Sequence, residues 1–203
     1  ANRGDWSKTP PLSPGDRLQI DIRDGEGFSG RYEVDIDGTL KLPHLSPLRV
    51  AGRQLSDVEK SIGHALVKGG YFKAGRVHVS ARVHEWSHAQ VFVSGAVFNP
   101  GMVSINVRNS EERALKNNLS SGDHSSERML NAALRSAGGV RPDAAIDRIQ
   151  VIRENRTINV DLSRVMTGHS IPMLPLMNGD RIVVPSNDTL DPGLIKVSSI
   201  TPP

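Results

Sequence analysis

Residues 12–22 read LSPGDRLQIDI, and this stretch decides the fold of the first half of the chain. Leu18, Ile20 and Ile22 alternate with polar residues, which is the period of a half-buried β-strand. The Pro-Gly-Asp before them predicts a turn that launches the strand. A similar phrase, LMNGDRI, recurs at residues 176–182. The repeat indicates two units, and it helps to locate where each of them begins and closes.

A hairpin is predicted next along the chain. An alternating apolar run at residues 32–36 leads into Asp37 and Gly38, and apolar residues resume at 40–42. Asp-Gly between alternating runs is a strong hairpin signal, because a tight primed turn needs positive φ.

The period then changes to that of a helix. Apolar residues recur at helical spacing over residues 55–66, with Ser56 or Asp57 expected to cap the start. The pair Gly69-Gly70 is expected to end this helix. Alternation at residues 77–83 predicts a further strand, so the first unit is predicted to run strand, hairpin, helix, strand.

The second unit is predicted to begin near residue 90. Its expected elements, in order, are a strand at 91–94, a bend at 95–101, a polar insertion at 106–128, a helix at 129–137 ended by Gly138-Gly139, and strands at 149–152, 158–160 and 182–184. Residues 186–203 lose all periodicity and are expected to form an irregular tail. The sequence thus predicts an α+β fold of two small modules.

Composition narrows the class of protein. The chain has 203 residues, of which 37% are hydrophobic and 23% charged, as in a globular protein. A net charge of +3 without a basic stripe argues against nucleic acid binding. The sequence contains no cysteine, which excludes disulfides and thiolate metal sites. No apolar run reaches the length of about 18 residues that a membrane-spanning helix needs.

Residues 84–88 read HEWSH and match the H-E-x-x-H pattern of zinc proteases. That chemistry needs a helix, which places both histidines on one side of the metal. Here the motif lies between a predicted strand and another strand at residue 91, with too few residues for such a helix. We interpret it as a polar corner, and we predict no catalytic residues, no metal and no cofactor.

The first unit contains five short sequence motifs. They are residues 12–16 (LSPGD), 32–40 (YEVDIDGTL), 42–43 (LP), 48–52 (LRVAG) and 69–72 (GGYF). With these phrases, residues 12–88 resemble the polysaccharide biosynthesis/export domain of outer-membrane polysaccharide export proteins. Residues 1–11 are then expected to form a flexible lead-in.

Residues 89–185 resemble the soluble-ligand-binding β-grasp domain that follows in the same family. The phrases that carry this resemblance are VSGAVFNPG at residues 93–101, LRSAGG at 134–139 and GDRIVVP at 179–185. The residues shared with the family are expected to serve the scaffold, and they are Pro14, Gly15, Asp16, Asp37, Gly38, Gly69, Gly70, Gly95, Pro100, Gly101, Gly138, Gly139, Gly179 and Asp180.

The resemblance implies a non-enzymatic component of an exopolysaccharide export machine in the periplasm, associated with the outer membrane. Its implied partners are the exopolysaccharide, an inner-membrane polysaccharide co-polymerase that regulates chain length, an outer-membrane barrel, and further copies of the chain in a homo-oligomer. The alternative is a periplasmic module of the same machinery that binds a glycan or small ligand on the β-grasp domain.

Overall fold

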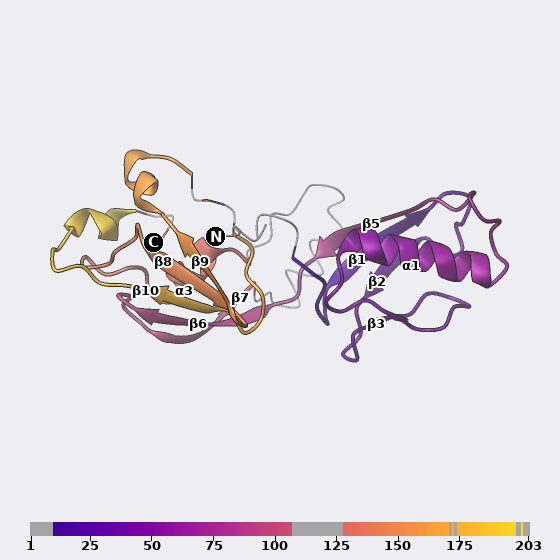
Figure 1. Cartoon of the computed structure of the whole chain (residues 1–203), viewed down its shortest axis with the longest axis horizontal. Coiled ribbons are helices and arrows are strands. Elements are labelled where there is room, and N and C mark those ends of the chain that lie inside the picture. Colours follow the sequence, from indigo (N-terminus) through magenta and orange to yellow (C-terminus); the bar gives the residue numbers. More distant parts are fainter. Residues whose placement is uncertain (1–9, 107–127, 171, 173, 198–199, 201–203) are drawn as a thin grey trace, which may run out of the picture. The chain divides into compact units, whose positions relative to one another are not determined.

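The computed structural model describes residues 10–106, 128–170, 172, 174–197 and 200. Within these residues the chain forms two compact units that divide between Ser87 and His88. We call the unit before this boundary the first module and the unit after it the second module. Each combines β-strands with an α-helix, as Figure 1 shows, so the predicted α+β fold class is confirmed.

A three-stranded antiparallel sheet forms the first module's framework. Its strands are β1 (Arg17–Ile22), β2 (Gly30–Glu33) and β5 (Val79–Glu85), with β1 in the centre. The three alternating apolar side chains of β1 are at most 5% exposed, so the period read from the sequence corresponds to one buried face. The other face of β1 carries its polar residues.

Helix α1 (Leu55–Lys68) lies beside this sheet (Figure 1). Its Val58, Ile62 and Leu66 are fully buried in the same core. The predicted helix is confirmed, but its predicted cap is wrong. Gln54 occupies the N-cap without a side-chain hydrogen bond, and the two expected cap residues lie inside the first turn. Aspartate in that turn still stabilises the helix, because it faces the positive end of the helix dipole.

The predicted turn at Asp37-Gly38 is confirmed, but the predicted pairing of the strands on either side of it is wrong. Gly38 has φ of 79°, and its N–H donates to the carbonyl of Asp35. Beyond the turn, however, β3 (Thr39–Leu40) pairs with β4 (Leu48–Arg49), whereas β2 pairs with β1. Just before the turn, the carbonyl of Val34 accepts the N–H of Gly15, and the N–H of Val34 donates to the carbonyl of Asp16. These bonds extend the pairing of β2 with β1, so β2 does not pair with β3.

The second module is built on a five-stranded mixed sheet in the order β7-β6-β10-β8-β9. The central strands β6 and β10 run parallel, and the other neighbours are antiparallel. The strands are β6 (Ala89–Gly95), β7 (Gly101–Ile105), β8 (Ile149–Arg153), β9 (Arg156–Val160) and β10 (Arg181–Val184). Strand β7 was not predicted.

Helix α3 (Leu130–Ser136) covers the core of the second module, as predicted for residues 129–137. Two short 3-10 helices follow, η1 (Ser163–Thr167) and η2 (Pro192–Lys196). Helix η2 lies where the sequence showed no periodicity, and its Leu194 is buried in the core of the second module. The predicted lead-in and polar insertion fall almost wholly outside the described residues.

Candidate functional site

The first Gly-Asp turn lies directly before β1. The N–H of Asp16 donates to the carbonyl of Ser13 at 3.1 Å, and between them Gly15 has φ of 87°. Pro14 precedes that glycine, which is the residue order of a type II turn. The buried carboxylate of Asp16 accepts the N–H of Ser13 at 2.7 Å and the N–H of Ser87 at 2.8 Å. Asp16 therefore ties the start of β1 to the end of the first module.

The second Gly-Asp turn repeats this geometry before β10. Gly179 also has φ of 87°, and the N–H of Asp180 donates to the carbonyl of Met177 at 3.1 Å. The carboxylate of Asp180 accepts the N–H of Met177 at 2.8 Å, as Asp16 does with Ser13. It also accepts two hydrogen bonds from the Arg153 guanidinium, at 2.9 and 2.7 Å. This charged pair is buried at its carboxylate and ties β10 to β8.

The second module brings most of its family-motif glycines together at one place. A Cβ on Gly95 would lie 2.0 Å from the carbonyl oxygen of Val184, so a side chain does not fit there. The bend from Gly95 to Pro100 crosses the end of α3, where a Cβ on Gly138 would lie 2.5 Å from the side chain of Asn99. Gly139 accepts a hydrogen bond from the same bend, and Gly101 begins β7 beyond it. The cluster is a tightly packed backbone crossing and offers no reactive group.

The remaining motif residues lie apart from this cluster, in the first module. Gly69 is the C-cap of α1, and Gly70 follows it with φ of 77°. Asp37 closes its turn by accepting the N–H and the hydroxyl of Thr39 at 2.9 and 2.6 Å. Where the structure describes them, these residues lie at turns, at helix ends and at strand ends.

The H-E-x-x-H segment has no helix. His84 and Glu85 are the last two residues of β5, and β6 begins at Ala89. A carboxylate oxygen of Glu85 lies 3.6 Å from the guanidinium of Arg17, so this glutamate belongs to an ion pair of the sheet. Among the described residues, no group of three His, Cys, Asp or Glu side chains could hold a metal ion. Residues 86–88 form neither a helix nor a turn, so the strand-like path predicted for this segment is confirmed.

Two exposed aspartates, one in each module, have perturbed acidity. The hydroxyl and N–H of Thr39 lower the pKa of Asp37 below its ordinary value. The hydroxyl and N–H of Ser163 likewise lower the pKa of Asp161. Both carboxylates hold short turns in the charged form, so neither is arranged to act as a general acid.

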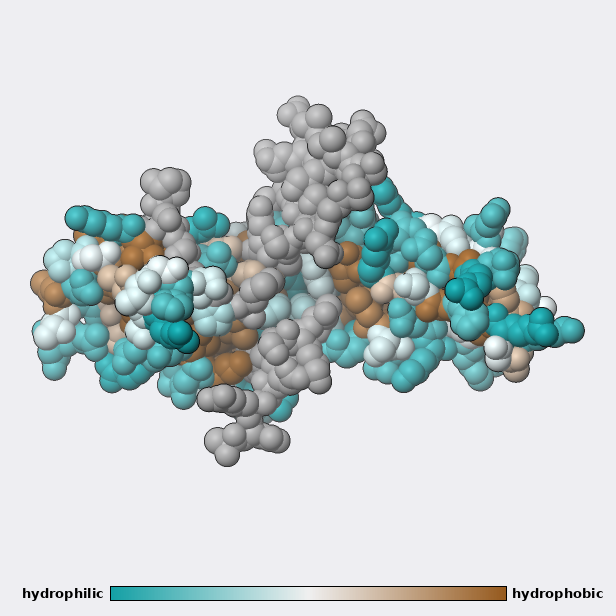
Figure 2. Space-filling view, turned by 90° about the horizontal axis from the view of Figure 1, so that it is seen from above, coloured by the Kyte–Doolittle hydropathy of each residue, from teal (hydrophilic) through white to brown (hydrophobic). Residues whose placement is uncertain are grey.

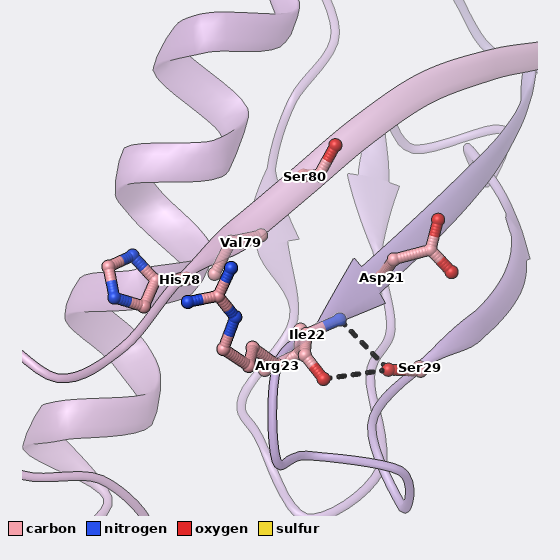
Figure 3. Close-up of a pocket in the computed structure, with 7 residues that line it drawn as sticks. All are labelled: Asp21, Ile22, Arg23, Ser29, His78, Val79 and Ser80. Carbon is pink, nitrogen blue, oxygen red and sulfur yellow. Dashed lines mark hydrogen bonds between the residues drawn. The ribbon is translucent and has the colours of Figure 1, made fainter.

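An open hollow of about 430 Å³ lies where β1 ends and β5 begins. Arg23 and His78 are backbone neighbours there, because the N–H of Arg23 donates to the carbonyl of His78. Figure 3 shows their side chains beside one another, with Asp21 toward the other side of the hollow. The hydroxyl of Ser29 is engaged with the backbone of Ile22. Such a hollow can hydrogen-bond a polar ligand but has no activated nucleophile among its lining residues.

The surface shown in Figure 2 is mostly hydrophilic over both modules, with smaller hydrophobic patches between the polar side chains. Within the described parts of the chain, no helix is both long and apolar enough to cross a membrane.

The known proteins that this chain is similar to are polysaccharide export and transport proteins. Residues 7–83 match the family model described as "Polysaccharide biosynthesis/export protein". Two versions of the "Polysialic acid transport protein KpsD" of Escherichia coli are similar to this chain, with 30% and 29% identity over 176 residues. Each alignment covers 85% of this chain but only 27% of the relative, so the chain spans about a quarter of the length of these curated proteins.

Proposed function

We propose that this chain, a member of the polysaccharide export protein family, is a non-enzymatic periplasmic component of an exopolysaccharide export machine. In this role it forms or extends a conduit that leads to the outer membrane. The observation that carries the proposal is the family match over residues 7–83, which covers nearly the whole first module. The family is one of transport and export proteins and is not a family of enzymes.

The arrangement of the described residues supports passive handling of the polymer. The family-motif residues shape turns, and Glu85 of the protease-like pattern lies in an ion pair with Arg17. A wall of hydrogen-bonding side chains without a tight site lets a sugar chain slide, because each contact with an exposed polar group is weak. We propose the second module to be the soluble-ligand-binding β-grasp domain, which its central parallel strand pair and the packing of helix α3 on its core support.

We also propose the partners of this chain in the export machine. They are the exopolysaccharide itself, an inner-membrane co-polymerase that regulates chain length, an outer-membrane barrel, and other copies of this chain. The relatives are named for the transport of polysialic acid, and the polymer handled by this chain is a separate question. Sedimentation over a range of concentrations tests the homo-oligomer, for which we expect weak and concentration-dependent association.

Deletion of the gene tests the proposed function. We expect the polymer on the cell surface to fall while glycosyltransferase activity in membrane extracts persists, because the chain makes no sugar bonds. Surface polymer at the level of the parent strain would contradict the proposal.

A second experiment tests the absence of catalysis. Glu85→Gln keeps the shape of the side chain and removes the carboxylate that a protease-like reaction would need. We expect export to continue at the parental rate. If Glu85→Gln abolishes export while the protein stays folded and abundant, the non-enzymatic proposal fails.

The hollow of Figure 3 favours one alternative, in which the chain is a glycan- or small-ligand-binding module of the same machinery. Sequence analysis placed such a ligand on the second module, whereas this hollow lies in the first. Saturable binding of short oligosaccharides would support the alternative, and a conduit should show little of it.

A further inference from the structure

A second and larger hollow of the first module runs along α1. It is a groove of about 650 Å³ between the helix and the segment that links β3 to β4. Lys60, His64 and Lys68 line it from the helix, and they follow one another at intervals of four residues. This spacing places the three side chains on one helix face, over a length of about 12 Å. We call this hollow the α1 groove.

The charge of the α1 groove is one-sided. Its lining residues include two lysines and two histidines, and none of them is acidic. Within the part of the chain that the structure describes, no ion pair involves Lys60 or Lys68. The neighbouring Glu59 is directed to the sheet, where it accepts the N–H of Ala81 at 2.7 Å.

The opposite wall of the groove is largely apolar. Leu45 and Leu48 line it, together with His44 at one end. Outside the groove, His44 belongs to a cluster of rings with Phe28 and Tyr71. The ring centroids of Phe28 and Tyr71 lie 4.9 Å apart in an edge-on arrangement. A sugar ring matches such a wall, because it has an apolar C–H face and a hydroxyl-bearing edge.

We propose that the α1 groove binds a carboxylated stretch of a sugar polymer. The two lysines contact two carboxylates of the polymer, and the wall formed by Leu45, Leu48 and His44 contacts a sugar face. Two cations separated by two helical turns suit a polymer with repeated carboxylates better than a single anion. Exposed ion pairs are individually weak, so the bound polymer is still able to move. The inference deepens the proposed function and depends on it only for the natural polymer, since the groove can be tested with a defined probe.

The test uses the isotope-labelled 203-residue chain and oligomers of galacturonic acid as the probe. In NMR titrations we expect the largest shift changes at the amides of residues 60–68 and 44–48. Neutral maltodextrins of the same length should bind far less, and added salt should weaken the acidic probe because it screens exposed charges. Lys60→Gln combined with Lys68→Gln should reduce affinity about fivefold, as expected for losing two exposed ion pairs.

Arg31→Gln combined with Arg82→Gln is the matched control. Both arginines are exposed and lie opposite Gln19 on the sheet face that points away from the core and from α1. This variant removes the same charge from the same module, and we expect it to bind the probe with unchanged affinity. The spectra of both variants establish that they are folded.

Several outcomes would overturn the inference. They are equal binding of the neutral sugar, shifts outside the α1 groove, equal loss in the control variant, or no binding of the acidic probe. If the lysine variant changes self-association in sedimentation but not probe binding, the groove is a contact between copies of the chain. Each of these results would leave the export proposal standing, because that proposal is tested by deletion.

Discussion

The two Gly-Asp turns form the same local structure from similar sequences and are anchored differently. Gly15 and Gly179 share φ of 87°, and Asp16 and Asp180 each accept the N–H three residues before them. Asp16 also holds the backbone N–H of Ser87, whereas Asp180 holds the guanidinium of Arg153. A few residues therefore determine the turn, and the tertiary fold determines what the turn is tied to.

The comparison extends to the boundary between the modules. In the first module the N–H of Ser87 is held by the aspartate of the turn, and in the second the N–H of Gln90 is held by the side chain of Asn178 at 2.9 Å. Each module thus uses its own turn to fix the end of chain that it contributes. This gives the repeated phrase a structural role in delimiting both units.

The largest effect is expected for Asp180→Ala. The change leaves the part-buried Arg153 without this carboxylate and should destabilise the second module by about 3–5 kcal/mol. Urea unfolding with hydrogen exchange should locate the loss in the second module. Asp147→Ala is the control, because its pair with Arg148 is exposed and should contribute less than about 1 kcal/mol. Equal losses would show that burial of the pair does not matter.

Asp16→Asn should have a smaller effect and act in the first module. The amide keeps one acceptor oxygen, so it can accept from Ser13 or from Ser87 but not in the geometry of both. One buried donor is then left unsatisfied, at a cost of about 1–3 kcal/mol. Hydrogen exchange should quicken in β1 and β5 and stay unchanged in the second module. Uniform destabilisation of both modules would contradict the separate roles of the turns.

Alanine at the two turn glycines sharpens the comparison further. Both substitutions strain a backbone with positive φ, by about 1–2 kcal/mol. A Cβ on Gly15 would also lie 3.1 Å from the Cβ of Ser87, whereas one on Gly179 would meet no atom within 4 Å. Gly15→Ala should therefore lower the free energy of unfolding more than Gly179→Ala does. If thermal or urea unfolding shows equal decreases in the free energy of unfolding for the two variants, the close contact with Ser87 relaxes without an energetic cost.

The smallest effect concerns acid. Asp37 and Asp161 have lowered pKa values in the folded chain, so each stabilises the fold in its charged form. This contribution is present above the pKa of the unfolded chain and is lost as the pH falls below about 4. Carboxyl NMR titration should give a lower pKa for both than for an unfolded peptide. The replacements Thr39→Val and Ser163→Ala should raise the respective values.

Sequence reasoning succeeded where periodicity is local. The alternation in β1 and the stripe of α1 each predicted an element and the face that it buries. It failed at the pairing of β2 and β3, because strand pairing depends on residues distant in sequence. The two-residue strands β3 and β4 are too short to show a period.

The candidate sites were harder to predict for the same reason. The spacing of Lys60, His64 and Lys68 is visible in the sequence, but the apolar wall opposite them comes from a different segment. Nothing in the sequence pairs Arg153 with Asp180, which are 27 residues apart and meet only through the order of the second sheet. By contrast, the H-E-x-x-H motif could be interpreted correctly, because the adjoining strands are periodic.

The most direct test of a role in export is to locate the polymer in a strain that lacks this chain. Cells are fractionated into surface, periplasmic and inner-membrane material, and the amount and length of the polymer are measured in each fraction. The account predicts polymer of normal composition that is made and retained inside the envelope, with little at the surface. Absence of polymer from every fraction, or polymer of altered length delivered normally to the surface, would contradict a role in export.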